Sequence, residues 1–421
     1  MKNLGNPYKF ASQLFPINRS LTGKGNLKTL TILKKKIKII KIKSFKVGKK
    51  VFDWKIPPVW NVSHAWLKKI NGDIICDFKK NNLHLLGYSI SVNKKLTFRE
   101  LRKNLFFLKD YPKAIPYVTS YYKKNWGFCL NYNVFKKMDR KSKYHVLIKT
   151  DFNYKGKMPY GEALIKGKDK REIVLSTYIC HPSMANNETS GIVVLSFLLK
   201  WLSNFKKPRY SYRFLFIPET IGSIAYINKH YEELRKNILT GIVITCVGDN
   251  GPFSLLKSKY KDAPGDKIIE RHLRRKGVNS KIYQWSDRGS DERQFCAPRV
   301  DLPFSSFMRT KYGEYKQYHT SEDNMNFISK KGLQGSIQFL QKIILDLEKS
   351  NFWRSRYMCE PMLSKRKLYP TISKVSNNNN DLLDILTWCD GKNSEKDISE
   401  ITNIKRLKSK LLILKKNHLI Y

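Results

Sequence analysis

Two neighbouring segments of the chain differ in how their apolar residues are spaced. Residues 173–180 (IVLSTYIC) form a short run rich in β-branched and aromatic side chains, which predicts a β-strand. In residues 191–202 the apolar side chains recur at helical spacing, which predicts an amphipathic helix. The polar segment between them, which begins at His181, therefore connects a strand to a helix.

Three further strand-like runs are followed by a histidine or an acid. The run within residues 214–223 (FLFIPETIGS) leads to Glu219, residues 241–246 (GIVITC) lead to Asp249, and residues 302–308 precede His319. Open α/β sheets bind their ligands at the carboxyl ends of their strands. This pattern favours convergence on one metal site, although the His181 loop taken alone also fits a capped turn whose imidazole only packs.

Sequence fragments along almost the whole chain match one family pattern. They are residues 14–23 (LFPINRSLTG), 51–58 (VFDWKIPP), 115–122 (IPYVTSYY), 178–185 (YICHPSMA), 218–223 (PETIGS), 289–295 (GSDERQF) and 318–321 (YHTS). With these motifs the chain resembles the di-zinc aminopeptidase-like superfamily. It resembles more closely a bacterial family of aminopeptidase-like proteins of unassigned function, whose genes often lie in surface-polysaccharide clusters. The resemblance implies a three-layer α/β zinc-exopeptidase-like fold with a mixed sheet, an inserted smaller domain and a C-terminal winged-helix-like module.

The resemblance also implies a set of metal ligands. His181 and His319 match the two imidazole ligands of the peptidases, and Asn187 stands where the peptidases have an aspartate that bridges two metal ions. Asp249 falls near the third strand-end acid, although strict register would place residues 246–247 there. The implied cofactor is zinc, as one ion or two.

The remaining implied roles concern catalysis and the substrate. Glu219 matches either the carboxylate that activates water or the acid that binds the second metal ion. The peptidases carry two adjacent acids at this point, whereas here the acid stands alone. Asp291 is implied to orient His319 or a substrate amine, and Tyr318 is expected to contact the substrate.

Asn187 is the departure from the peptidase pattern that matters most. An amide oxygen is neutral and is a poorer zinc ligand than a carboxylate. A site for two metal ions therefore lacks the negative charge of the bridging ligand. Glu188 could supply a carboxylate, but it lies about 100° further round if the helix has begun. Ser183 also replaces an acid that holds the first histidine in the peptidases. One firmly bound metal ion is therefore favoured over two.

Three functions compete on these residues. The first is metal-assisted hydrolysis of a terminal amide in a small peptide, an aminoacyl sugar or an N-acyl sugar, with Glu219 taking a proton from water. The second is a degenerate hydrolase that binds such a ligand without cutting it, which Asn187 favours. The third is a regulator whose winged helix binds DNA while the hydrolase-like domain senses a metabolite.

The composition changes this picture little. Lys and Arg number 81 against 34 Asp and Glu, and a net charge of +47 would normally indicate a nucleic-acid or membrane-surface partner. The lysines accompany Asn and Ile along the whole chain, however, as in proteins of AT-rich genomes. The sequence lacks an apolar run of 18 residues and a signal-peptide pattern, which predicts a cytoplasmic protein without membrane insertion. Seven cysteines without a CxxC motif make a disulfide scaffold an unfavoured interpretation.

The chain is long enough for two or three domains. We expect a discontinuous hydrolase domain (1–58 and 146–350), an inserted lid or substrate domain (59–145), a linker (351–380) containing four consecutive Asn, and a winged-helix-like module (381–421). Within the module, residues 382–388 and 404–414 predict amphipathic helices separated by a polar stretch at 390–396, and residues 418–421 predict a last strand. The module carries many lysines, but packing or homodimer formation is favoured over DNA binding.

Overall fold

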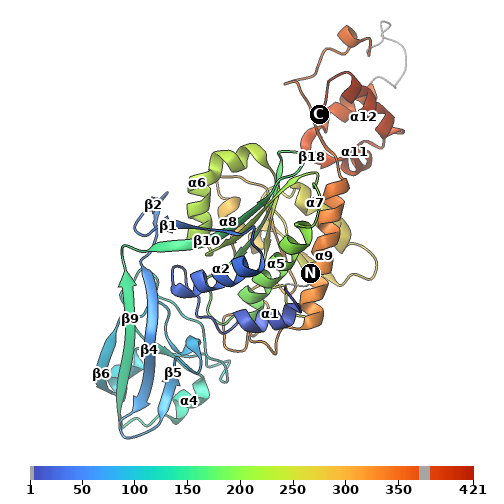
Figure 1. The fold of residues 1–421 in the computed structure, drawn as a ribbon. Helices are drawn as coiled ribbons and strands as arrows, with labels where there is room; N and C mark the ends of the chain where they lie inside the picture. The colour runs from blue at the N-terminus through green and yellow to red at the C-terminus, as the bar shows by residue number, and fades with distance from the viewer. Residues whose placement is uncertain (1–3, 369–379) are drawn as a thin grey trace.

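A mixed eight-stranded β-sheet forms the centre of the computed structural model, which describes residues 4–368 and 380–421 (Figure 1). In spatial order the strands are Lys41–Lys46 (β1), Lys157–Ile165 (β10), Ser211–Ile217 (β12), Glu172–Tyr178 (β11), Ile238–Ile244 (β13), Phe304–Met308 (β16), Phe253–Leu256 (β14) and Ser280–Tyr283 (β15). The four central strands β12, β11, β13 and β16 run parallel to one another. Their carboxyl ends therefore meet at one edge of the sheet.

Helices cover both faces of this sheet. On one face lie Pro7–Leu14 (α1), Lys24–Lys36 (α2), Ser190–Leu202 (α5), Pro264–Leu273 (α7) and Lys330–Lys349 (α9); on the other lie Ile221–Asn237 (α6) and Glu292–Phe295 (α8). Alternate strand residues enter the two cores: Ile173 and Leu175 pack on the first face and Val174 on the second. The expected three-layer α/β fold is confirmed.

The strands and the helix around the candidate site agree with the sequence pattern. Strand β11 covers most of the run at 173–180, and α5 covers residues 191–202. An irregular π-helical turn, Ala185–Thr189 (η2), precedes α5. Gly191, the second residue of α5, lies where a Cβ would be 2.4 Å from Thr177 Oγ1 and 2.6 Å from Ile244 O, so a side chain there would clash. The glycine thus lets α5 start directly against the ends of β11 and β13.

The inserted domain is built on a four-stranded antiparallel sheet of order β5-β4-β9-β6, set apart from the central sheet (Figure 1). Its elements are Val59–Lys69 (β4), Ile74–Asp77 (β5), Asn82–His84 (η1), Val92–Thr97 (β6), Phe98–Arg102 (α3), Leu105–Phe106 (β7), Phe128–Cys129 (β8), Tyr132–Lys137 (α4) and Lys143–Asn153 (β9). The expected boundary at 145/146 is wrong, because β9 pairs with β4 as far as Val59↔Asn153. An apolar run does not reveal which sheet a strand will join.

The C-terminal module differs from the expectation in several details. It comprises Phe352–Arg354 (β17), Ser364–Arg366 (η4), Asn380–Thr387 (α10), Asp390–Ser394 (β18), Glu395–Thr402 (α11) and Leu407–Lys416 (α12). The expected linker begins with β17, which pairs with β18, and most of its Asn run lies outside the described residues. The polar stretch at 390–396 contains β18 and the start of α11, a helix absent from our expectation that begins with a capping box. In place of a last strand, Ile420 forms an isolated bridge to Ser355.

The module packs against α7 of the hydrolase domain. Arg271 Nη1 lies 2.5 Å from Asp397 Oδ1, and Lys267 Nζ donates to Asn393 Oδ1 at 2.5 Å. Two shorter strands, Lys50–Val51 (β2) and Trp54–Lys55 (β3), and the turn Trp285–Asp287 (η3) complete the described elements. Within the described ranges, none of the helices has the length and apolarity needed to cross a bilayer.

Candidate active site

Three of the residues expected at a metal site come together beyond the carboxyl ends of the parallel strands. His181 follows β11, Glu219 follows β12, and His319 lies in the long loop after β16. His181 Nε2 is 3.7 Å from Glu219 Oε2, and the ring centroids of the two histidines are 5.3 Å apart. Two imidazoles that share one zinc ion at about 2.0–2.1 Å have ring centres roughly 6 Å apart at most. The two rings are therefore close enough to share an ion.

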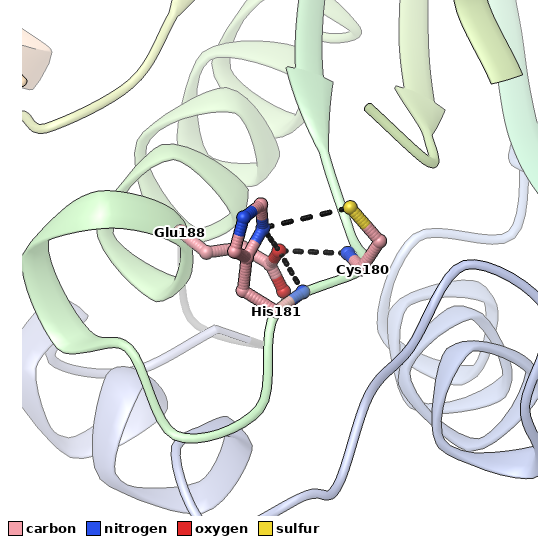
Figure 2. Close-up of side chains that lie close together, drawn as sticks. All are labelled: Cys180, His181 and Glu188. Atoms are coloured by element: carbon pink, nitrogen blue, oxygen red, sulfur yellow. Dashed lines mark hydrogen bonds and ion pairs between the residues drawn. The ribbon is translucent and has the colours of Figure 1, made fainter. Parts of the chain in front are cut away.

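A buried carboxylate fixes the orientation of His181 (Figure 2). Glu188 Oε2 accepts hydrogen bonds from His181 Nδ1 at 2.9 Å, from the Cys180 backbone N–H at 2.7 Å and from the backbone N–H of His181. Its other oxygen lies 2.5 Å from Arg19 Nε, and both side chains of this ion pair are 0% exposed. With Nδ1 held by the carboxylate, Nε2 is the nitrogen left to face Glu219.

Glu188 therefore positions a histidine instead of offering a metal ligand in place of Asn187. The donor atoms of Cys180, His181 and Glu188 lie within 4.8 Å of one another, a spacing that would suit a cation. Their contacts, however, are hydrogen bonds to a carboxylate whose charge Arg19 already balances. Glu188 fulfils the orienting role that an acid at position 183 has in the peptidase pattern. The 169-residue separation of Arg19 from Glu188 hid this pair from sequence reasoning.

The pKa values of the two histidines are shifted in opposite directions. Burial alone lowers the pKa of His181, but the hydrogen bond and charge of Glu188 outweigh it, so that its pKa is raised. Burial and the nearby His181 lower the pKa of His319 to about 3. His319 is therefore a neutral imidazole, the form that binds metals.

Asn187 is held with its oxygen free. Thr245 Oγ1 donates to the Asn187 backbone oxygen at 2.8 Å, so the 2.5 Å contact between Thr245 and Tyr178 needs the Tyr178 hydroxyl as donor. Tyr178 then accepts from Asn187 Nδ2 at 2.8 Å. This chain of hydrogen bonds fixes the orientation of the Asn187 amide. The amide oxygen Oδ1 is buried and has no hydrogen-bond partner in the described part of the chain.

Glu219 shares its end of the sheet with Asp291. Ser290 Oγ donates to Glu219 Oε1 at 2.8 Å, and the Thr220 backbone N–H donates to Asp291 Oδ1 at 2.7 Å. Thr220 has a φ of 62°, a conformation unusual for a β-branched residue. Burial raises the pKa of Glu219 and, together with the Glu219 charge, raises that of Asp291 to about 8. Asp291 thus lies beside Glu219 and accepts a hydrogen bond from a backbone N–H, and among the described residues no hydrogen bond joins its carboxylate to His319.

Two tyrosines line the histidines. The Tyr318 ring stacks on His319 with centroids 3.9 Å apart. Tyr117, from the inserted domain, has its ring centroid 5.3 Å from that of His181 and 5.2 Å from that of His319. Its backbone N–H donates to the His319 oxygen at 2.8 Å, which joins the insert to the histidine loop. Sequence reasoning missed Tyr117; the available signal was its place in the motif at 115–122.

Asp249 has a different environment from the one expected of a metal ligand. Its carboxylate accepts hydrogen bonds from the Gly251 backbone N–H at 2.6 Å, from Thr310 Oγ1 at 2.8 Å and from Asn186 Nδ2 at 2.8 Å. These bonds tie together the loops after β13 and β16. Cys246 occupies the position that strict register with the peptidase pattern would assign to the third strand-end acid. It lies beside Asn187, and the distance from Cys246 Sγ to Asn187 Nδ2 is 3.9 Å. Asp249 therefore holds these loops together and does not belong to the group formed by His181, Glu219 and His319.

The donor set fits one metal ion better than two. His319 Nε2, Asn187 Oδ1 and Asp291 Oδ2 are buried without hydrogen-bond partners among the described residues, a costly state that a cation or a polar substrate would relieve. Two ions need bridging and flanking carboxylates, but Asn187, Thr220 and Cys246 offer only neutral groups at those places. The chemistry of the site thus suits a single zinc ion.

Comparison with known proteins agrees with this architecture. A family model described as a domain of unknown function (DUF4910) matches residues 8–350, and a winged helix-turn-helix model matches residues 351–421. The chain belongs to the DUF4910 family. A relative from Clostridium acetobutylicum, provisionally named a polysaccharide biosynthesis protein with an aminopeptidase-like domain, is 42% identical over 399 residues, which are 94% of this chain and 91% of the relative.

Solved structures extend the family likeness to the fold of zinc aminopeptidases. A crystal structure of a protein from Clostridium acetobutylicum, provisionally called a peptidase, superposes with a TM-score of 0.81 at 39% identity over 99% of this chain and 95% of the other. A zinc aminopeptidase from Bacillus subtilis superposes with a TM-score of 0.60 at 13% identity, over 81% of this chain and 94% of the other. This member of the DUF4910 family thus has an aminopeptidase-like fold followed by a winged helix, as the motifs implied.

Proposed function

We propose that the protein is a zinc-dependent hydrolase that cleaves a terminal amide, with one metal ion held by His181, His319 and the Asn187 oxygen. The observation that carries this proposal is the meeting of two imidazoles, one of them oriented by Glu188, and Glu219 at one end of the sheet. When bound, zinc would polarise the substrate carbonyl and lower the pKa of water. The relation to the fold of zinc aminopeptidases supports this choice of metal.

The residues of the chain itself supply proton transfer and positioning. Glu219 is suited to take a proton from water, since Ser290 holds one of its oxygens and the other points toward His181. Asp291 Oδ2, which is buried and unpaired within the described residues, is available to an amine of the substrate. Tyr318 and Tyr117 provide aromatic walls beside the histidines.

The substrate that we favour is an aminoacyl or N-acyl group on a sugar. Support comes from the relative that is named for polysaccharide biosynthesis. A small peptide is the other substrate that an aminopeptidase-like fold suggests. Both present a terminal amide carbonyl, so the same groups would act on either.

Metal content and hydrolysis test the proposal together. Purified protein, the His181→Ala and His319→Ala variants, and a His64→Ala control in the inserted sheet are compared by elemental analysis and by release of amine from aminoacyl and N-acyl sugars. We expect about one zinc per chain in the wild type and the control, and loss of zinc and hydrolysis in both site variants. Zinc retained in both site variants would refute the ligand assignment.

A second function is favoured by the neutral groups at the site. Asn187 and Cys246 stand where charge would be needed for strong activation of water, so in this alternative the same site holds a sugar-linked amide without cleaving it. Zinc binding with saturable ligand binding but without hydrolysis would support this alternative. The cytoplasmic location, the homodimer and the unfavoured DNA binding stay predictions from the sequence.

A further inference from the structure

A cavity of about 450 Å³ lies at the end of the central sheet opposite to the candidate active site. Its wall includes Ile238, the first residue of β13, and Pro303, directly before β16. The site residues follow the other ends of the parallel strands. Arg354 and Lys392 of the C-terminal module complete the wall, so the cavity lies at the junction of the hydrolase domain and the module.

The cavity wall carries an excess of positive charge. Two of its lysines are neutralised locally, by ion pairs between Lys259 and Asp301 at 2.6 Å and between Lys392 and Asp262 at 2.8 Å. Four other exposed cations in the wall have no ion pair within the described residues: Arg235, Lys236, Arg299 and Arg354. These four come from the end of α6, the loop before β16 and β17, three segments far apart in the sequence.

One further acid and one helix end also line the cavity, and the single carboxylate of Asp390 reduces the positive charge without cancelling it. Asp390 Oδ1 accepts hydrogen bonds from the backbone N–H groups of Lys392 at 2.7 Å and Asn393 at 3.2 Å. Ala263 and Pro264, which begin the ten-residue helix α7, line the cavity, and no side chain caps this N-terminus. The partial positive charge of a helix N-terminus adds to that of the arginines.

We infer that this cavity binds a small molecule carrying a diphosphate, such as a nucleoside diphosphate or its sugar ester. Arginines bind phosphate oxygens in pairs of hydrogen bonds, and four cations can serve two adjacent phosphates. The volume falls within the range of small-molecule sites. Tyr260, 61% exposed, and Tyr231 line the cavity and offer aromatic faces to a base or sugar.

The shape of the wall favours a small molecule over a nucleic acid. The cationic side chains converge on a cavity instead of lying along a stripe, and acids Asp262 and Asp301 are interspersed among them. A continuous phosphate backbone would meet those carboxylates. Because both parts of the chain contribute cations, a bound diphosphate would tie the winged-helix module to the hydrolase domain.

Calorimetric titration of the full chain with inorganic pyrophosphate, ADP, UDP and a short DNA duplex tests this assignment. The Arg235→Ala/Arg299→Ala double variant is compared with Lys206→Ala/Lys207→Ala, which removes the same charge from exposed lysines outside the cavity. All titrations are repeated in the His181→Ala background, because pyrophosphate also binds zinc. Circular dichroism checks that each variant is folded.

We expect saturable pyrophosphate binding that weakens at least tenfold in the cavity variant, changes less than twofold in the lysine control and persists without His181. Tighter binding of ADP or UDP than of pyrophosphate would identify a nucleotide as the source of the diphosphate, and equal binding would identify the diphosphate alone. Equal loss of affinity in both double variants would show a general charge effect and overturn the assignment. Displacement of pyrophosphate by the duplex, with the same loss in the cavity variant, would assign the cavity to nucleic acid and overturn it too.

Discussion

Replacement of Glu188 by glutamine tests whether this buried carboxylate both stabilises the fold and orients His181 for metal binding. The glutamine has the same shape but no charge. If its oxygen faces the three N–H groups at Cys180 and His181, its NH2 group meets the Arg19 Nε–H donor; if it flips, the NH2 group meets the other donors. Neither orientation satisfies all the partners, so the substitution leaves the guanidinium of Arg19 buried without its counter-charge.

The size of the effect follows from the burial of the pair. Both side chains are 0% exposed, and removal of one partner of such a pair costs about 3–5 kcal/mol. Loss of the group that orients a metal-binding histidine typically weakens metal binding about 10–100-fold. We therefore expect Glu188→Gln to lower both the melting temperature and the zinc affinity.

A matched control distinguishes these two losses. Glu172 forms a pair of similar length with Arg213, with a distance of 2.6 Å from Nε to Oε2, but it lies at the amino end of β11, away from His181. Glu172→Gln should lower the melting temperature while zinc affinity stays within twofold of wild type. The Arg19→Met/Glu188→Gln variant, which removes the unpaired charge, should regain stability but keep a reduced zinc affinity.

The assay is competition for zinc with a chromogenic chelator, run beside thermal unfolding of the metal-free proteins. If folded Glu188→Gln protein binds zinc as tightly as wild type, Glu188 has a purely structural role and our account of His181 is wrong. Equal loss of zinc affinity in the Glu172 control would point to general destabilisation as the cause.

Three further substitutions test other parts of the structure. Tyr178→Phe removes the hydroxyl that accepts a hydrogen bond from Asn187 Nδ2, which frees the amide to turn. Zinc affinity should then fall about tenfold at most while the protein stays folded. Unchanged zinc affinity would contradict the role of this hydrogen-bond chain in orienting Asn187. Asn187→Asp restores the charge of the peptidase pattern and should raise the zinc content per chain in elemental analysis; unchanged metal content and hydrolysis would mean that residue 187 is misplaced at the ligand position. Burial raises the pKa of Asp266 to about 6 from its ordinary 3.8, so the folded state holds this proton more tightly than the unfolded chain does. The stability of the protein therefore falls as pH rises from about 4 to about 6, by about 3 kcal/mol at most. In Asp266→Asn, urea unfolding at pH 4 and pH 7 should show a smaller fall; an equal fall in both proteins would exclude Asp266 as its source.

The pattern of apolar runs was sufficient to predict the central architecture. Strands buried on both faces need continuous apolar segments, and α5 needs apolar residues at helical spacing. The sequence therefore predicts the strands β11, β12, β13 and β16 and the helix α5. Because parallel strands present their carboxyl ends at one edge, the meeting of His181 and Glu219 there follows from the same pattern.

The tertiary structure decided which way the polar groups of the site face. Glu188 and Asp249 are both acids beside strand ends, yet one holds His181 while the other ties two loops together. Their roles depend on Arg19 and Thr310, partners supplied by distant parts of the chain. Hydrophobic periodicity reports burial, whereas a buried polar group is assigned by the donors and acceptors that folding brings to it, which local sequence does not contain.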